Sequence, residues 1–390
     1  MSFSTAVKVA TVLYNIWADE QNKTTAWDQT AVMSTSIERQ MPDGKTLQLR
    51  FESTPIHPSG NFQIVMRLLR MDEQSSRPID EMGYTSEMVR SIDEMTTGST
   101  GLVILVGPVN SGKSTTQQAL LSRTRKHRGK NIKMVTVEDP VEYLIEGACQ
   151  IGVPKGRKDQ EEDSGNTFRS ILKSTLRLDP DVLMIGEIRN QDVASVVKDG
   201  VLTGKKYFST LHASDAFTVF TRLVELGMPK TVLTSSGFLS GIIYQRLLPK
   251  VCPHCSMSVH EAVQGGHIDE GLYKRLSSVV SFDKHNVRVR RRDGDVVGCQ
   301  ECGYLGIIGR CVCAEIVVPD KTMLNYVLNN QEAQAKNWWY ENAGHRIPSL
   351  GVSAMAHAIL NMRNGLVDPV DIEINLGLIK ADNFDVVSHH

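Results

Sequence analysis

Apolar residues recur at helical spacing near the start of the chain and at strand-like positions soon after it. Within residues 6–17, apolar side chains fall three or four positions apart, as they do on one face of a helix. Short apolar or alternating segments follow at 37–40, 47–51 and 64–69, and a turn sequence separates the first two. The pattern predicts an opening helix followed by a small antiparallel meander.

A short, purely apolar run covers residues 102–106, and similar candidate strands follow at 132–137, 182–185 and 207–210, with helix-length segments between them. An uninterrupted apolar run such as 102–106 is typical of a strand that is buried on both faces of a parallel sheet. Strands that alternate with helices imply crossover connections. We therefore expect an α/β core built on a parallel sheet.

The chain changes character at three places. The polar segment 71–78 is the expected linker between the first sheet and the α/β core. After Leu248 the sequence becomes polar and rich in cysteine and arginine, and from about Pro319 it reads as mainly helical. We predict four parts, an N-terminal α+β domain at 1–80, an α/β core at 81–250, a cysteine-containing subdomain at 251–315 and a helical C-terminal region at 316–390.

The composition is that of a soluble globular protein. Of the 390 residues, 41% are hydrophobic and 22% are charged, and 43 Lys and Arg balance 44 Asp and Glu to a net charge of -1. Nothing global therefore attracts the chain to nucleic acid or to anionic lipid. No run approaches the roughly 18 uncharged apolar residues that span a bilayer, and the N-terminus lacks a secretion-signal pattern. We expect a cytoplasmic protein with no direct nucleic-acid partner.

Residues 107–114 match the phosphate-binding pattern GxxxxGK[ST], directly after the predicted strand 102–106 and before a helical stretch at 115–125. Backbone amides and a helix N-terminus can surround a phosphate there, Lys113 adds positive charge, and the Ser114 hydroxyl can ligate Mg²⁺. The alternative is a glycine-containing turn with an exposed lysine. The predicted nucleotide-binding residues are Gly107, Pro108, Val109, Asn110, Ser111, Gly112, Lys113, Ser114 and Thr115.

Two acidic residues follow predicted strands. Glu187 comes at the end of the strand at 182–185, after Gly186, and Glu138 follows the strand at 132–137. The carboxyl ends of parallel strands meet at the edge where phosphates bind, so these acids can assist a metal and polarise an attacking water. Glu138 can alternatively be a capping acid before a proline turn. His212 also follows a predicted strand, but by itself it fits a structural hydrogen bond as well.

Four of the seven cysteines form two pairs, Cys252 with Cys255 and Cys299 with Cys302. In a cytoplasmic chain this spacing favours a metal over disulfides, and four thiolates suit tetrahedral Zn²⁺. The interval between the pairs is longer than the about 15–20 residues of a compact zinc ribbon, so reduced structural thiols remain the alternative.

Four motifs stand in one order along the chain: GPVNSGKSTT at 107–116, TVEDPVEY at 136–143, LRLDPDVLMIGEIRN at 176–190 and STLHASDA at 209–216. Together they resemble the secretion ATPase superfamily that powers type II secretion, type IV pili and type IV secretion. In that family they are the Walker A motif, the Asp box, the Walker B motif and the His box. The resemblance implies a P-loop NTPase (RecA-like) core with ATP as ligand.

The resemblance also implies roles for single residues. It gives Glu138 the general-base role, Glu187 the Walker B role and His212 that of a γ-phosphate sensor. Arg50 and Arg67 match the two arginines with which the family's first domain neutralises phosphate charge. Their alternative is cross-strand pairing on a solvent-facing sheet.

The paired cysteines resemble the tetracysteine zinc subdomain of the pilus-assembly and type II secretion branch. We therefore expect a homohexameric ATPase, peripheral at the inner membrane, that drives type IV pilus assembly or type II-like secretion through an inner-membrane platform protein. The alternatives are a type IV (conjugative) secretion ATPase, a nucleic-acid translocase and a nonhydrolysing scaffold. We interpret the arginine run at 288–292 as a solvated face, with acidic lipid or a protein partner as the alternative.

Overall fold

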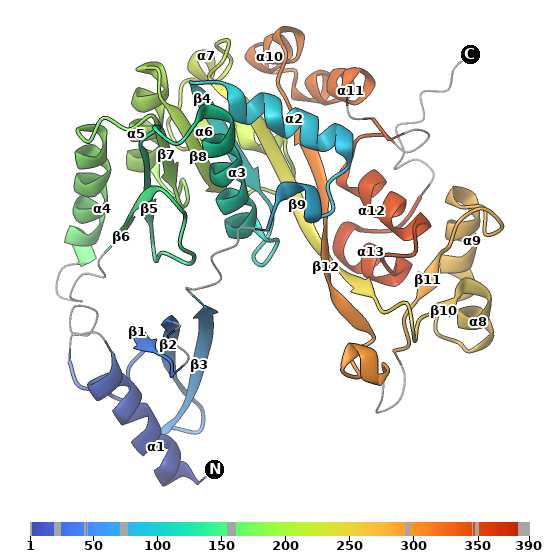
Figure 1. Ribbon diagram of the computed structural model, residues 1–390, viewed down its shortest axis with the longest axis horizontal. Coiled ribbons are helices and arrows are strands. Elements are labelled where there is room, and N and C mark those ends of the chain that lie inside the picture. The colour runs from blue at the N-terminus through green and yellow to red at the C-terminus, as the bar shows by residue number, and fades with distance from the viewer. Residues whose placement is uncertain are drawn as a thin grey trace. The chain divides into compact units, whose positions relative to one another are not determined.

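The computed structural model describes residues 2–18, 25–42, 44, 46–70, 77–153, 161–292, 297–344, 346–347 and 351–380. Contacts divide the chain into unit 1, Met1–Ser76 with Gly129–Gly186, and unit 2, Arg77–Arg128 with Glu187–His390. Most of the linker predicted at 71–78 lies outside the described residues. Figure 1 shows the elements of both units.

The N-terminal part of unit 1 confirms the predicted helix and meander. Its elements are α1 Phe3–Val12, continued by a π-helical turn at Leu13–Trp17, and the antiparallel strands β1 Met33–Gln40, β2 Thr46–Ile56 and β3 Asn61–Arg70 in the order β1-β2-β3. Tyr14 packs against Phe51 of β2 with ring centroids 5.9 Å apart. Ile37 of β1 is completely buried beside them. Burial of these apolar side chains holds the helix against one face of the sheet.

The second part of unit 1 contains three parallel strands. They are β5 Met134–Glu138, β6 Ala148–Gly152 and β7 Val182–Ile185, in the order β6-β5-β7, and the helix α4 Glu161–Leu176 precedes β7. β5 and β7 are fully buried and confirm two predicted strands. β6 was not predicted, because it is a half-exposed edge strand of mixed polarity.

Unit 2 is organised around β4 Gly101–Val106, whose residues are all buried. β8 Lys206–Leu211 and β9 Leu239–Val251 pair with β4 on either side, both parallel to it. β12 Ile307–Val317 pairs antiparallel with β9. β4 and β8 confirm the remaining predicted strands. β9 and β12 were not predicted, because polar residues interrupt both and neither shows a short apolar run.

Helices pack around these strands and form most of the C-terminal region, as predicted. Those of unit 2 are α2 Ser86–Thr97, α3 Lys113–Arg128, α5 Gln191–Leu202, α6 Thr218–Glu225, α7 Lys230–Leu233, α8 Val259–Gln264, α9 Glu270–Val279, α10 Lys321–Leu328, α11 Glu332–Asn342, α12 Ala354–Arg363 and α13 Pro369–Leu376. A two-stranded ribbon joins β10 Met257–Ser258 to β11 Arg288–Val289. Among the described residues, no helix combines the length and apolar character needed to cross a bilayer.

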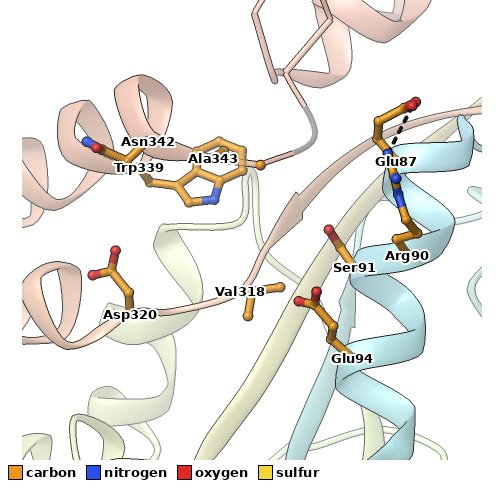
Figure 2. A pocket seen from close by; sticks show the side chains of 10 residues that line it. Glu87, Arg90, Ser91, Glu94, Val318, Asp320, Trp339, Asn342 and Ala343 are labelled. Carbon is orange, nitrogen blue, oxygen red and sulfur yellow. Dashed lines mark hydrogen bonds and ion pairs between the residues drawn. The ribbon is translucent and has the colours of Figure 1, made fainter.

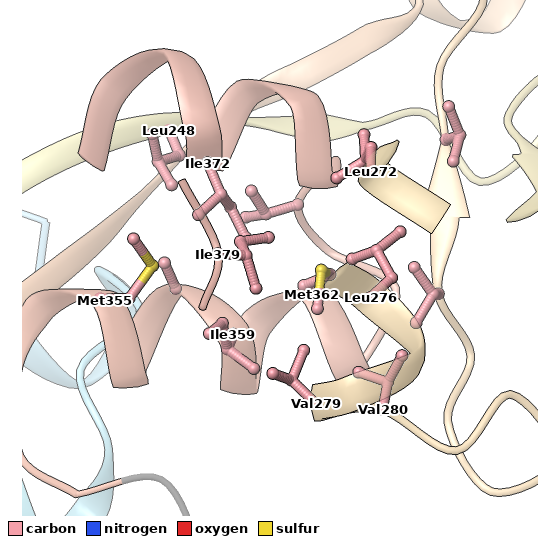
Figure 3. Close-up of a cluster of buried hydrophobic side chains, with 14 of the residues drawn as sticks. Leu248, Leu272, Leu276, Val279, Val280, Met355, Ile359, Met362, Ile372 and Ile379 are labelled. Carbon is pink, nitrogen blue, oxygen red and sulfur yellow. The ribbon is translucent and has the colours of Figure 1, made fainter. Parts of the chain in front are cut away.

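One hydrophobic core links the cysteine-containing segment to the C-terminal helices. Leu272 and Leu276 of α9 pack in the same cluster as Ile359 and Met362 of α12 and Ile372 of α13 (Figure 3). Ile359, Met362 and Ile372 have no solvent-exposed surface. The short helices α8 and α9 are therefore stabilised by packing against α12 and α13 rather than by a separate core.

The arginine run at 288–292 is not a solvated face as a whole, so that interpretation is wrong for three of its four arginines. Arg288 donates hydrogen bonds to the hydroxyl and to the carbonyl oxygen of Ser256. Arg290 donates two hydrogen bonds to Asp371, both of 2.9 Å, and Arg292 donates one of 2.7 Å to Asp368. Asp368 is 0% exposed and Asp371 is 4% exposed, so their buried charges need these partners. Arg291 between them is exposed. Two of the arginines thus tie the end of β11 to the start of α13.

Candidate functional site

The loop at 107–112 connects β4 to α3 and lies against β9. At Gly107 the backbone φ is +148°, and a Cβ atom there would lie 2.4 Å from the carbonyl oxygen of Gln245. At Gly112 φ is +85°, and a Cβ would lie 3.0 Å from Cδ1 of Leu247. Both positions therefore require glycine, and the loop can only sit this close to β9 because they lack side chains.

Lys113 begins α3 and turns its side chain back across the loop. Its Nζ donates hydrogen bonds to the carbonyl oxygens of Gly107 at 2.8 Å and Pro108 at 2.9 Å. Burial lowers the pKa of Lys113, and the nearby carboxylate of Glu187 opposes that shift. Ser114 follows on the first turn of α3, where it is exposed. A cationic amine, a hydroxyl and a helix N-terminus thus converge on one loop, which fits an anionic phosphate.

Glu187 and His212 approach one another in unit 2. Nε2 of His212 lies 3.3 Å from Oε1 of Glu187, and Nε of Arg189 donates a hydrogen bond of 2.9 Å to Oε2. The His212 side chain is 53% exposed and that of Glu187 is 21% exposed. Because Glu187 also acts electrostatically on Lys113, unit 2 brings three predicted site residues into one neighbourhood.

Glu138, at the end of β5 in unit 1, is a buried carboxylate held by two side chains. Its Oε1 accepts hydrogen bonds from Oγ1 of Thr136 at 2.6 Å and from Nε2 of Gln150 at 3.0 Å. Burial raises the pKa of Glu138, and the two hydrogen bonds partly oppose this. A carboxylate with a raised pKa is a stronger base than an ordinary glutamate, which favours the role of a general base.

Arg50 and Arg67 are directly opposite one another on β2 and β3. Arg50 is half-buried and Arg67 is exposed. Two like charges at facing positions of an antiparallel pair are unfavourable. Glu52, two positions after Arg50 on β2, lies on the same face and offsets part of this positive charge, and a bound anion would offset the rest.

The four paired cysteines come together as predicted, with all four Sγ atoms within 4.8 Å of one another. The Sγ–Sγ distance is 3.9 Å for Cys252 and Cys299, 3.8 Å for Cys255 and Cys302, and 3.9 Å for Cys299 and Cys302. Thiolates about 2.3 Å from a central zinc ion occupy corners about 3.8 Å apart. The separations therefore fit a tetrahedral zinc site.

The backbone around the cluster favours a thiolate at Cys302. Burial alone would raise the pKa of Cys302, but hydrogen bonds from the backbone N–H groups of Cys299 and Gly306, each 3.2 Å from its Sγ, together with those from the thiols of Cys255 and Cys299, lower the pKa to about 6. A thiolate is the form that binds metal. Cys311 and Cys313 lie on β12 and are not part of the four-sulfur cluster.

A separate pocket of about 460 Å³ lies between α2 and the segment from the end of β12 to the end of α11. Glu87 and Glu94 of α2 line one side, and Asp320 and Trp339 line the other (Figure 2). Nε1 of Trp338 donates a hydrogen bond of 2.8 Å to Asp320. None of the predicted site residues lines this pocket.

Several residues that support the site were missed at the level of sequence. Thr136 lies two positions before Glu138 on the same strand, so strand periodicity would have placed both side chains on one face. Gln150 lies on the unpredicted strand β6, and Gln245 on the unpredicted strand β9. Tyr84 precedes α2 and donates a hydrogen bond to Gln245. No local pattern marks the last three.

Sequence comparison places this chain beside secretion and pilus proteins. The family described as type II/IV secretion system protein matches residues 4–366. The type II secretion system protein E of Pseudomonas aeruginosa is 33% identical over 292 residues, which cover 75% of this chain and 52% of that protein. The type IV pilus assembly ATPase PilB of Thermus thermophilus is 32% identical over 69% of this chain and 27% of its own length. The chain thus spans about half the length of its type II secretion relatives, or less.

Solved structures agree in fold. The pilus retraction motor PilT with bound ADP superposes with a TM-score of 0.58 at 20% identity, covering 88% of this chain and 77% of that chain. The ATPase DotB of Legionella pneumophila gives 0.57 at 18% identity, covering 88% of this chain and 77% of that chain. At these identities the similarity concerns the fold alone, and it supports the predicted P-loop α/β core.

Proposed function

The chain belongs to the type II/IV secretion system protein family, and we propose that it is an ATP-hydrolysing motor of type IV pilus assembly or type II-like secretion. The observation that carries the proposal is the arrangement in unit 2. There, Lys113 reaches across the glycine loop, and the Glu187–His212 pair lies within electrostatic range of it. A cation, an acid and an imidazole around one phosphate-binding loop suit the cleavage of a terminal phosphate.

We assign the binding step to the loop and the first turn of α3. The loop amides and Lys113 would hold the phosphates of ATP, and Lys113 would exchange its two carbonyl partners for phosphate oxygens. The exposed hydroxyl of Ser114 would contribute a ligand to Mg²⁺. When bound, the metal ion would neutralise part of the triphosphate charge and so lower the barrier to attack by water.

The chemical step needs a residue that accepts a proton and residues that respond to the γ-phosphate. We propose Glu138 as the general base, because its carboxylate is buried and its pKa is raised. Glu187 would help to hold the metal and its water, and His212 would sense the γ-phosphate. Arg50 and Arg67 would neutralise phosphate charge, which would also relieve their mutual repulsion on adjacent strands.

The cysteine cluster is proposed as a structural zinc site. Cys252, Cys255, Cys299 and Cys302 supply four sulfurs, which closes a tetrahedral site and leaves no position for substrate. Zinc would there hold the end of β9 against the start of β12. This role is structural and does not enter the hydrolysis step.

Assembly and location form the remaining part of the proposal. We propose a cytoplasmic homohexamer at the inner membrane that passes the movement of each hydrolytic cycle to a platform protein. The names of the pilus and secretion relatives support this context. Light scattering in the presence of a nonhydrolysable ATP analogue measures the assembly, and a strictly monomeric chain would contradict it.

Phosphate release from ATP by the purified chain tests the enzymatic proposal. We expect Lys113→Ala to lose ATP binding and Glu187→Gln to bind ATP but to release phosphate at least tenfold more slowly. Lys130→Ala, at an exposed lysine just beyond α3, is the matched control and should behave like the unmodified chain.

Two results would contradict the proposal in different ways. If the unmodified chain bound ATP but released no phosphate above background, and Glu187→Gln behaved in the same way, a scaffold that only binds nucleotide would be favoured. Strong stimulation by single-stranded DNA at moderate salt would favour a nucleic-acid translocase instead.

A further inference from the structure

A chain of buried hydrogen bonds runs under the phosphate-binding loop. The hydroxyl of Tyr84 donates to Oε1 of Gln245 at 2.8 Å, and Nε2 of Gln245 donates to the carbonyl oxygen of Ser111 at 2.7 Å. Gln245 has no exposed surface, Ser111 is 3% exposed and Tyr84 is 7% exposed. The Tyr84 hydroxyl also lies 3.5 Å from Oγ1 of Thr116. Because the amide of Gln245 is buried from water, it depends on Tyr84 and on the Ser111 carbonyl for these two hydrogen bonds.

β9 forms the floor on which the loop rests. Gln245 and Leu247 are two positions apart on this strand, so their side chains point to the same side. A Cβ atom at Gly112 would lie 3.0 Å from Leu247 and 3.3 Å from Nε2 of Gln245. The backbone of Gln245 also approaches Gly107 closely. One residue of β9 thus contacts both glycines of the GxxxxGK pattern.

The hydrogen bond to Ser111 determines which way one peptide group points. Because the peptide unit is planar and trans, the carbonyl of Ser111 and the N–H of Gly112 point in opposite directions. Holding the carbonyl down on β9 therefore turns the Gly112 N–H away from β9. If this peptide rotated, it would present a carbonyl oxygen where the loop presents a donor, and an anion would be repelled.

Glycine itself provides little resistance to such a rotation. Gly112 has φ +85°, and glycine populates positive and negative φ about equally readily. Asn110, two positions earlier, also has a positive φ of +63°. Hydrogen bonds within the loop hold the Ser111 N–H and the carbonyls of Gly107 and Pro108, whereas the Ser111 carbonyl, which belongs to the peptide in question, is held from outside the loop by Gln245.

We propose that Gln245, held by Tyr84, is a positioning residue that keeps the phosphate-binding loop in its anion-binding conformation. The inference rests on the proposed nucleotide site, and it adds a residue that determines how tightly this site binds nucleotide. Gln245 contacts the loop rather than the nucleotide. Its loss should therefore weaken the binding of ADP and ATP alike, because both place phosphates on the same amides.

Titration with a fluorescent ADP analogue, at a temperature where every variant is folded, measures this effect. We expect Gln245→Met, which has a similar volume but no amide, to bind ADP about tenfold more weakly or worse. Gln245→Glu keeps the acceptor for Tyr84 but loses the donor to Ser111, so it should be as weak. Tyr84→Phe should weaken binding by about threefold, because Gln245 keeps its bond to Ser111.

Tyr207→Phe is a matched control for Tyr84→Phe. The Tyr207 hydroxyl is buried in the same unit but has no hydrogen-bond partner among the described residues. Its removal should leave ADP affinity unchanged within about twofold. Because Tyr84 acts through Gln245, the double variant Tyr84→Phe/Gln245→Met should bind like Gln245→Met alone.

The outcomes separate the inference from the function on which it rests. A wild-type chain that binds neither ADP nor ATP would overturn both. If the Gln245 and Tyr84 variants bound ADP as tightly as the wild type and only their unfolding temperatures were lower, the inference alone would be overturned. That result would show that the two hydrogen bonds merely stabilise the core. Weaker binding by these variants, with Tyr207→Phe unaffected, would support it.

Discussion

Nε2 of His212 lies 3.3 Å from Oε1 of Glu187, although the two residues come from different loops. Arg189 occupies the other oxygen of the same carboxylate at 2.9 Å. Each oxygen of the Glu187 carboxylate thus has its own partner. Arg189 lies on the same loop as Glu187, whereas His212 lies on a different loop. This pairing makes His212 the group best placed to report on changes near the phosphate-binding loop.

Replacement of His212 should therefore affect turnover more than binding. We expect His212→Ala to lower the rate of ATP hydrolysis by about tenfold to a hundredfold, because a donor to the γ-phosphate is lost in the transition state. ADP has no γ-phosphate, so its affinity should change by less than about twofold. His260→Ala, at an exposed histidine of α8, is the control. Equal losses of ADP affinity and turnover would contradict the sensor role.

The hydrogen bond from Thr136 to Glu138 should set the acid side of the pH–rate profile. Thr136→Val keeps the shape of the side chain but removes a bond of 2.6 Å that opposes the raised pKa of Glu138. The pKa should then rise further, and the acid limb of kcat/KM for ATP should move to higher pH. Thr96→Val, at a buried threonine of α2, should leave the limb in place. An unmoved limb in both variants would exclude Glu138 as the titrating base.

The same carboxyl group should make stability depend on pH in a defined direction. Burial raises the pKa of Glu138 in the folded chain, so the folded state holds this proton more tightly than the unfolded state does. Its contribution is fully present below the ordinary glutamate pKa of about 4.3 and is lost as pH rises through the folded value. Glu138→Gln cannot titrate, and it should therefore gain stability relative to the wild type as pH rises across this interval. Urea unfolding at several pH values measures the difference, and a parallel pH dependence of both proteins would contradict it.

The cysteine cluster predicts about one zinc ion per chain. Elemental analysis of purified protein should find this ratio, and Cys302→Ser should reduce the metal content and lower the unfolding temperature. Cys149→Ser is the matched control, because Cys149 is an exposed cysteine outside the cluster. A fully folded wild-type chain without metal would rule out the structural zinc site.

Two neighbouring arginines should differ sharply in their effect on stability. Arg292→Met leaves the buried carboxylate of Asp368 without its ion pair and should lower the free energy of unfolding by about 3 kcal/mol. Arg291 is exposed, so Arg291→Met should change it by less than about 0.5 kcal/mol. Urea unfolding of both variants gives the comparison. Equal effects would mean that the pairing with Asp368 contributes little.

Local patterns were sufficient for the elements nearest the phosphate-binding loop. The apolar run at 102–106 became β4, because burial on both faces favours apolar sequence, and the segment at 207–210 became part of β8, which is buried although it contains Ser209 and Thr210. The glycine loop was recognisable for a similar reason, since its function depends on a few residue types at short, constant spacing. The cysteine pairs were recognisable from the same kind of short spacing.

Distant pairings could not be found in this way. β9 and β12 contain polar residues, so neither sequence alone predicts a strand. β9 is stabilised by pairing with β4 and β12, and β12 by pairing with β9. The arginine run looked like a solvated face because its partners, Asp368 and Asp371, lie far along the chain.

Residue types and their short-range spacing were thus enough to identify strands of the parallel core, the phosphate-binding loop and each of the two cysteine pairs, because each depends on neighbours within a few positions. Folding in three dimensions was needed to bring Gln245 under Ser111, His212 to Glu187, and Asp368 to Arg292. These contacts join segments that are remote in the chain, and the burial that makes them strong exists only once the surrounding core has packed.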